Sequence, residues 1–197
     1  MKIIEDKGYL VRYKKFLEDN FQVSSDEWDV ISRYGEIIFV PKNEYFVEQG
    51  KICRWLGFIA AGIMRFCMFR DDKDITCYFV NENDFAGDPE SFYARKPSDK
   101  NMQALTDCVL AAVTLENLQH VHQQLPRFGE IMREIDHRVM MGLMTQRDFL
   151  QHADAAEKYR LFMKHYPHIL QNVPLSYIAS FLGITQQSLS RLRKEIS

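Results

Sequence analysis

The chain has 197 residues, of which 46% are hydrophobic, and its formal net charge at pH 7 is -2. This length suits one large globular domain or two small ones, and the hydrophobic content is enough for a buried core. No apolar run reaches the length of about 18 residues that a membrane helix needs, and the N-terminus lacks the apolar core of a signal peptide. We therefore expect a cytoplasmic protein with no membrane partner.

Positive charge is concentrated towards the C-terminus. Residues 153–197 contain six lysines or arginines and three acids, so this segment carries +3 and the rest of the chain carries -5. Positive potential attracts nucleic acid, and a dimer would double the charge. The C-terminal segment is therefore the better candidate for a DNA-binding unit.

Two short helices are expected at the start of the chain. Between residues 9 and 20, apolar side chains recur on one helical face, and a second helix begins at Ser25, which we predict as its N-cap. These helices are expected to cover one end of the unit that follows.

Residues 35–114 are rich in strand-forming side chains. Short runs of Ile, Phe, Tyr and Val, such as EIIFV, WLGFIAAG and ITCYFV, are separated by polar turn clusters. Met64, Phe66 and Met68 repeat with the period of two that a half-buried strand shows. Several strands at this spacing predict an antiparallel jelly-roll barrel.

Residues 71–74 are predicted to turn the strand that starts at Met64 back into a second strand, residues 75–80, as a hairpin. A jelly roll is also the fold of metal-dependent cupin enzymes, which hold their ion with histidines on barrel strands. Here all six histidines follow the barrel, so we exclude a cupin reaction and expect no metal, cofactor or catalytic residue.

The four cysteines are Cys53, Cys67, Cys77 and Cys108, and no two of them form a C-x-x-C pair. This spacing provides no ligand set for a zinc ribbon or an iron-sulfur cluster. We interpret them as buried free thiols.

A long helix is predicted from Pro126, a favourable first helical residue, to about His152. Its apolar positions form a narrow stripe, which has two interpretations: the helix packs on its own barrel or on a second copy of itself. A second copy, related by a two-fold axis, would make the protein a homodimer. The stripe comprises Phe128, Met132, Ile135, Val139, Leu143 and Gln146.

The segment from Pro174 to Arg193 reads as two short helices joined by a tight turn. Gly183 is suited to the left-handed backbone that often ends a helix, and Thr185 follows as a favourable N-cap for the next helix. Inward-facing apolar residues leave a polar outer face on the second helix. This layout is typical of a helix-turn-helix, although an ordinary helical hairpin with a solvated face has the same pattern.

The motif resembles the DNA-binding end of the CRP/FNR family, in which a Gly-x-[Ser/Thr] turn precedes the recognition helix. Here the turn is Gly183 to Thr185, followed by Gln186, Gln187 and Arg191. The strand region, with Gly62 and the turn at residues 84–88, resembles the cyclic-nucleotide-binding barrel of the same family. The short family members common in Bacteroidetes are the most similar.

The resemblance implies an α+β protein in three parts: a barrel-type effector domain in residues 1–125, a dimerisation helix in 126–152 and a winged-type helix-turn-helix in 153–197, with Ala153 and Asp154 as the hinge. Since the chain stops four residues after Arg193, we expect a truncated wing. The implied partners are double-stranded DNA with a palindromic operator, a second copy of the chain, RNA polymerase and a small-molecule effector.

As a hypothesis, the outer face of the recognition helix reads bases through Gln186, Gln187 and Arg191, because glutamine suits adenine and arginine suits guanine. The remaining polar residues of the motif are expected to contact phosphates, cap helices or complete the exposed face. They are Ser176, Thr185, Ser188, Ser190, Arg193 and Lys194.

The candidate effector pocket departs from that of the cyclic-AMP binders in the family. Gly87-Asp88 stands where those proteins have Gly-Glu, and Ser98-Asp99 falls where they have the Arg-Ser that holds the cyclic phosphate. Because an aspartate repels a phosphate, we do not expect cyclic AMP as the effector. An anionic ligand remains open if Arg95, Lys96 or Lys100 substitutes for the arginine, and a solvated loop with Asp88 as a helix cap is the alternative.

Arg65 and Met144 complete the candidate pocket. Met144 belongs to a methionine-rich part of the long helix that could equally serve dimer packing. The sequence thus predicts a non-enzymatic transcription regulator, controlled allosterically by an unknown effector. The alternative is a ligand- or partner-binding module whose helix-turn-helix no longer binds DNA.

Overall fold

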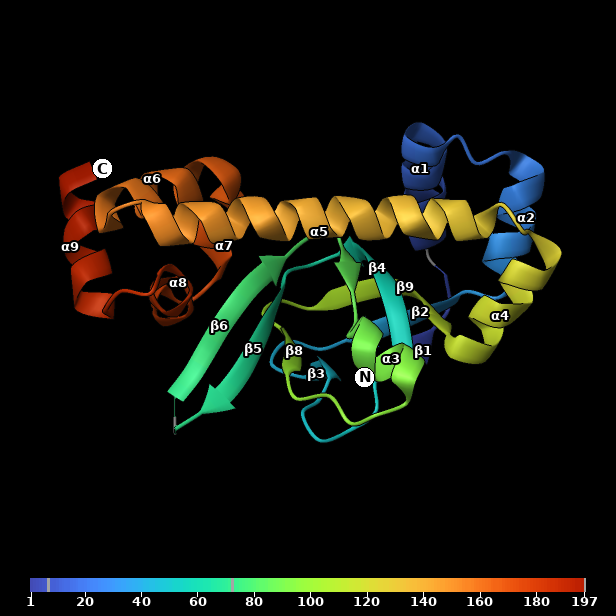
Figure 1. Ribbon diagram of the computed structural model, residues 1–197, viewed down its shortest axis with the longest axis horizontal. Helices are drawn as coiled ribbons and strands as arrows, with labels where there is room; N and C mark the ends of the chain where they lie inside the picture. Colours follow the sequence, from blue (N-terminus) through green and yellow to red (C-terminus); the bar gives the residue numbers. More distant parts are fainter. Residues whose placement is uncertain (7, 72, 197) are drawn as a thin grey trace.

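The computed structural model describes residues 1–6, 8–71 and 73–196, which form two antiparallel sheets and a set of helices (Figure 1). The helices are α1 (Tyr9–Phe21), α2 (Ser25–Arg33), α3 (Pro89–Ala94), α4 (Leu115–Gln124), α5 (Phe128–His152), α6 (Ala155–His165), α7 (Pro167–Asn172), α8 (Leu175–Leu182) and α9 (Gln186–Ile196). The strands are β1 (Lys2–Ile4), β2 (Glu36–Val40), β3 (Tyr45–Val47), β4 (Trp55–Ala61), β5 (Met64–Arg70), β6 (Lys73–Val80), β7 (Phe85–Ala86), β8 (Asn101–Ala104) and β9 (Cys108–Thr114).

The sheets confirm the predicted antiparallel architecture. One sheet has the strand order β1-β2-β9-β4-β7 and the other has the order β3-β8-β5-β6. Aliphatic and aromatic side chains of both sheets form one core cluster, which α1, α2 and α4 extend. The predicted hairpin is present, since β5 pairs with β6 from Met64 opposite Val80 to Arg70 opposite Lys73. Residue 72 of the predicted turn lies outside the described residues.

The N-terminal helices form as predicted, with one shift. The N-cap of α2 is Ser24, not Ser25: the Ser24 hydroxyl accepts the amide of Glu27, and the Glu27 carboxylate accepts the amide of Ser24. This reciprocal capping box satisfies two orphan amides at once, which places the cap one residue earlier. The Ser24 amide, and then Arg127, hold the pKa of the Glu27 carboxyl below its ordinary value.

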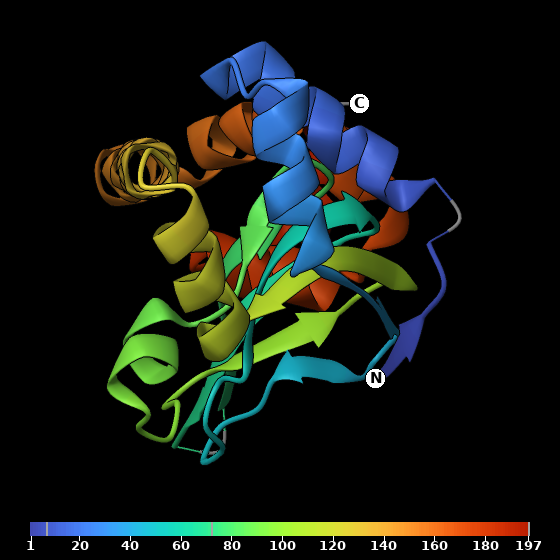
Figure 2. The same ribbon diagram turned by 90° about the vertical axis from the view of Figure 1, so that its right-hand side faces the viewer.

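The long helix α5 divides into two halves. It begins at Phe128 rather than Pro126, because the amides of Phe128 and Gly129 first bond three residues back. Its first half packs on the barrel through Phe128, Ile131 and Ile135, which are all buried. Figure 2 shows α5 nearly end-on, with α4 leading into it and α1 and α2 above the sheets.

The second half of α5 exposes large apolar side chains, which are Val139, Met140, Met141, Leu143 and Met144. Towards its end the buried Gln146 amide donates to the Tyr166 hydroxyl, at 2.9 Å. The apolar stripe thus packs on the chain's own barrel in its first half only. The second half is open to another contact.

The C-terminal helices α6 to α9 gather at the far end of α5, and α8 lies beside β6 of the β5-β6 hairpin (Figure 1). Their core includes Phe162, Ile178 and Leu182. Three barrel residues belong to the same buried cluster: Ile63, Phe79 and Leu105. The prediction of a half-buried strand from Met64 is therefore wrong for its first four residues, which are all buried. The reason is that α8 covers the face of β5 that would otherwise meet water.

Two glycines with left-handed backbone differ in the space around them. Gly62 has φ +101°, and an added Cβ would lie 2.6 Å from the Asp107 carbonyl oxygen and 2.6 Å from the Cys108 sulfur. Gly183 has φ +68° and open space around it. Only the first position combines backbone strain with steric overlap.

We expect Gly183→Ala to lower the free energy of unfolding by about 1–2 kcal/mol through backbone strain alone. Gly62→Ala should lower it by about 1–3 kcal/mol more, because its Cβ meets backbone and a buried side chain. Urea unfolding of both variants measures the difference. Equal losses would show that the turn after β4 relaxes around a methyl group.

Candidate nucleic-acid interface and effector site

The turn between α8 and α9 has the local structure that the sequence predicts. Gly183 is left-handed, and its amide and that of Ile184 bond back to Ser180 and Ala179 to close the end of α8. The Thr185 hydroxyl accepts the amide of Ser188 at 3.1 Å and so caps α9. Leu189 is fully buried against the preceding helices. Glycine, cap and buried leucine together fix how α9 leaves the turn.

The outer face of α9 is polar and exposed. Gln186, Gln187 and Arg191 are all exposed. Gln186 and Gln187 are consecutive, and Arg191 follows Gln187 by four residues, one helical turn, so the three side chains lie on neighbouring positions of the helix surface. Ser190, Arg193 and Lys194 are exposed on the same helix, and Ser176 is exposed on α8. The Thr185 and Ser188 hydroxyls lie 2.9 Å apart, so both have a local partner at the start of the helix.

Three of the residues predicted for the effector pocket lie together. Asp88 is the N-cap of α3, where its carboxylate accepts the Ser91 amide, and its second oxygen lies 2.7 Å from the Ser98 hydroxyl. Asp88 and Ser98 are both buried, at 7% and 3% exposure. Gly87 precedes them with φ +140°, and a Cβ there would meet Leu56 at 2.5 Å. The predicted capping role of Asp88 is confirmed.

The other three predicted pocket residues lie elsewhere. The Asp99 side chain is 79% exposed and forms an ion pair with Lys100. Met144 is half exposed on α5, and Arg65 is buried between β5 and α8. The structure therefore brings Gly87, Asp88 and Ser98 into one place and exposes the side chain of the neighbouring Asp99 to solvent. Arg65 and Met144 lie apart from this cluster.

Lys100 is the basic residue that approaches the barrel interior. Its Nζ lies 5.8 Å from the centroid of the Phe66 ring, and that ring stacks on Tyr78 at 4.8 Å. Both aromatic rings belong to the β5-β6 hairpin and pack against the barrel core.

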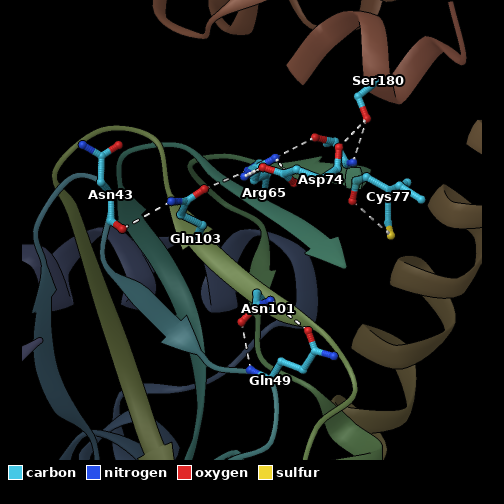
Figure 3. A network of polar contacts seen from close by, with 10 residues as sticks. Asn43, Gln49, Arg65, Asp74, Cys77, Asn101, Gln103 and Ser180 are labelled. Carbon is cyan, nitrogen blue, oxygen red and sulfur yellow. Dashed lines mark hydrogen bonds and ion pairs between the residues drawn. The ribbon is translucent and has the colours of Figure 1, made fainter. Parts of the chain in front are cut away.

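Arg65 is the centre of a polar network that the sequence did not reveal (Figure 3). Its guanidinium binds Asp74 through two hydrogen bonds of 2.8 and 2.6 Å, and it also donates to Gln103 at 2.9 Å and Thr76 at 3.1 Å. The Tyr177 ring of α8 covers it, with the guanidinium carbon 3.6 Å from the ring centroid. A basic residue inside a run of buried strand residues was the available signal, since a buried charge requires partners.

The cysteines have the surroundings of structural thiols. Cys53, Cys67 and Cys108 are buried free thiols, as predicted, whereas Cys77 is free but only partly buried. Burial raises the pKa of Cys67 and of Cys108 to about 11, so both are protonated at neutral pH. Among the described residues, no cluster of histidines, cysteines and acids has the grouping to hold a metal ion.

Comparison with known proteins identifies the barrel. Residues 37–124 match the family described as "Cyclic nucleotide-binding domain". A stretch of 91 residues is 31% identical to the voltage-gated inwardly rectifying potassium channel KCNH6 of Gallus gallus, covering 46% of this chain and 7% of the channel. The chain thus spans a small fraction of this relative. No described helix is long and apolar enough to cross a membrane.

Solved structures extend the likeness to about nine tenths of the chain. The c-di-GMP responsive global regulator CLP of Xanthomonas campestris superposes with a TM-score of 0.66 at 15% identity, covering 88% of this chain and 91% of that one. A structure from Eubacterium rectale assigned to the crp/fnr family of transcriptional regulators superposes with a TM-score of 0.68 at 14% identity, covering 92% and 87%. The chain therefore shares the fold of these two solved regulators, and the region that matches the cyclic nucleotide-binding family lies within that fold.

The Asp88 to Ser98 contact predicts a stability role for a residue of the candidate pocket. Asp88→Ala removes the cap of α3 and leaves the buried Ser98 hydroxyl without its carboxylate, so we expect a loss of about 2–4 kcal/mol in the free energy of unfolding. The exposed Asp99→Ala is the matched control and should change it by less than about 0.5 kcal/mol. Thermal unfolding compares the two, and a silent Asp88→Ala would contradict the role.

Proposed function

We propose that the chain is a transcription regulator of the CRP/FNR type that binds double-stranded DNA as a homodimer. The observation that carries this is the capped helix α9, whose polar face is exposed at the end of a chain that shares the fold of such regulators. In this proposal residues 153–197 bind DNA, 126–152 form the dimer and 1–125 hold the effector.

The reading residues follow from the chemistry of base edges. A glutamine can pair with adenine and an arginine with guanine through two hydrogen bonds in the major groove, and Gln186, Gln187 and Arg191 offer these groups from the first turns of α9. In this proposal the phosphates beside them are contacted by Ser176, Ser190, Arg193 and Lys194, which are all exposed. Thr185 and Ser188 cap the start of α9, and their hydroxyls are close to the DNA backbone in this proposal.

The second half of α5 supports dimerisation. Five large apolar side chains are between 38% and 49% exposed there, on a part of the helix that leaves the barrel. A symmetric partner that presents the same stripe would bury them, and two-fold symmetry matches an inverted repeat in DNA. The two reading helices would then contact half-sites about 34 Å apart, one turn of the duplex.

We also propose that the effector is not cyclic AMP. The region that would hold a cyclic phosphate contains Asp88, already bound to Ser98, and the exposed Asp99. A ligand of the barrel would meet the Phe66 and Tyr78 rings, together with Lys100 as its cation, which suits a planar molecule of low negative charge.

The reading function is tested by selecting binding sites from random duplexes with the full chain, without effector, at near-physiological salt. We expect enrichment of an inverted repeat with half-sites about 10 base pairs apart. Arg191→Ala should weaken binding to the selected site by about 1–3 kcal/mol and relax the preference at one base pair.

Arg160→Ala is the matched control, since Arg160 is exposed on α6, outside the reading face. A uniform loss of affinity on all duplexes for Arg191→Ala would make Arg191 a phosphate contact instead. Enrichment of no sequence, in buffer and in cell extract alike, together with salt-insensitive binding, would favour a module whose helix-turn-helix no longer binds DNA.

The dimer is tested with a charge in the exposed stripe. We expect Leu143→Glu to convert the dimer into a monomer in sedimentation experiments, because it places a carboxylate in the centre of an apolar contact. Val11→Glu, at a residue 67% exposed on α1, is the matched control and should leave the dimer intact. A dimer that survives Leu143→Glu would place the interface elsewhere.

A further inference from the structure

The β5-β6 hairpin is buried on both of its faces. On the inner face, Met64 and Phe66 belong to the barrel core, and Phe66 stacks on Tyr78. On the outer face, Arg65 and Thr76 lie under α8. Since alternate residues of a strand point to opposite faces, each strand of the hairpin contacts the barrel interior and the C-terminal helices at successive positions.

The contact of Arg65 with Tyr177 depends on where α8 lies. Arg65 is 1% exposed, and its partners Asp74, Thr76 and Gln103 all come from the barrel, whereas the ring that shields it from water comes from α8. If α8 moved away, the guanidinium would keep its ion pair and regain water. The hairpin thus tolerates both positions of α8, with a preference for the covered one.

Ser180 makes the second contact. The Thr76 amide donates to the Ser180 hydroxyl oxygen at 3.1 Å, and the same hydroxyl donates to the Asp74 carbonyl oxygen at 3.2 Å (Figure 3). β6 is the last strand of its sheet, so these two backbone groups have no further strand to bond. One side chain of α8 therefore satisfies a donor and an acceptor on the free edge of the sheet.

An aromatic cluster lies next to these contacts. The ring of Phe79, on β6, lies 5.4 Å from that of Phe181 and 6.0 Å from that of Phe162. Meanwhile Gln186, Gln187 and Arg191 stay exposed. Docking of α8 on the hairpin therefore fixes the position of α9 without covering its reading face.

We propose that the hairpin and α8 form a latch that holds the reading helix in its DNA-binding position and connects that position to the barrel interior. The latch consists of Arg65, Asp74 and Thr76 on the hairpin, with Tyr177 and Ser180 on α8. A ligand that moves the Phe66 and Tyr78 rings on the inner face shifts the residues between them, on which α8 rests. This proposal rests on the proposed function for its effect on DNA.

The latch has a direct readout that needs no DNA. The Thr76 amide is protected from hydrogen exchange by Ser180, so its exchange rate reports how often α8 leaves the hairpin. We expect Tyr177→Leu to raise that rate about tenfold, because the cation-π contact is lost. Tyr177→Phe is the matched control and keeps the ring, so its rate should stay within about twofold of the natural chain.

Ser180→Ala calibrates the measurement, since it should release the Thr76 amide even when α8 is docked. Nuclear magnetic resonance exchange on the full chain gives the rates. Unchanged exchange at Thr76 in Tyr177→Leu, with Ser180→Ala fast, would overturn the latch. Circular dichroism and thermal unfolding show whether Tyr177→Leu has lost its fold. If it has, Arg65→Met is used instead, because it removes the same contact from the other side.

The effect on DNA is measured separately, on the site obtained by selection. If only the docked position of α8 and α9 binds DNA, a smaller docked fraction lowers the apparent affinity. Tyr177→Leu should therefore weaken binding to the inverted repeat about three- to tenfold, with non-specific binding unchanged. Tighter binding would overturn the proposed direction. Failure of the natural chain to bind any duplex would refute the proposed function, whereas the exchange rates would still decide whether the latch exists.

Discussion

The structure depends on a buried guanidinium. Arg65 is 1% exposed, and a charge so far from water is tolerated only with a full set of partners. Its hydrogen-bond partners come from β6 and β8, and the Tyr177 ring of α8 covers it, so neighbouring strands satisfy the charge and a helix from a distant part of the chain shields it from water. The contact between Tyr177 and this cation gives α8 a specific place on the barrel. The neighbouring contacts between aromatic rings would not define that place alone.

Local signals predicted much of the fold. Gly183 and Thr185 define the turn between α8 and α9 through their own backbone conformation and hydroxyl, so neighbouring residues were enough to recognise it. The sheet region was recognisable from alternation and turn clusters for the same reason. The predicted N-cap of α2 was wrong by one residue and the predicted start of α5 by two. A reciprocal capping box decided the first boundary and a tight turn decided the second.

What the sequence could not reveal depends on contacts between distant residues. The prediction of a half-buried strand from Met64 assumed water on one face, yet that face is covered by Tyr177, more than 100 residues later. Arg65 was assigned to the effector pocket, yet it lies under α8, and no pattern in the chain indicates which face of a strand a later helix will cover. Asp88 was better predicted, since a cap is a local structure.

The contact of the Ser180 hydroxyl with the edge of β6 bears on aggregation. β6 ends its sheet, and an uncovered edge strand is a template for pairing with another chain. In the docked position α8 covers part of that edge and satisfies its amide and carbonyl groups. Any motion that lifts α8 off β6 therefore also opens a sheet edge to other molecules, so protection against aggregation limits how far and how long the C-terminal helices can leave the barrel.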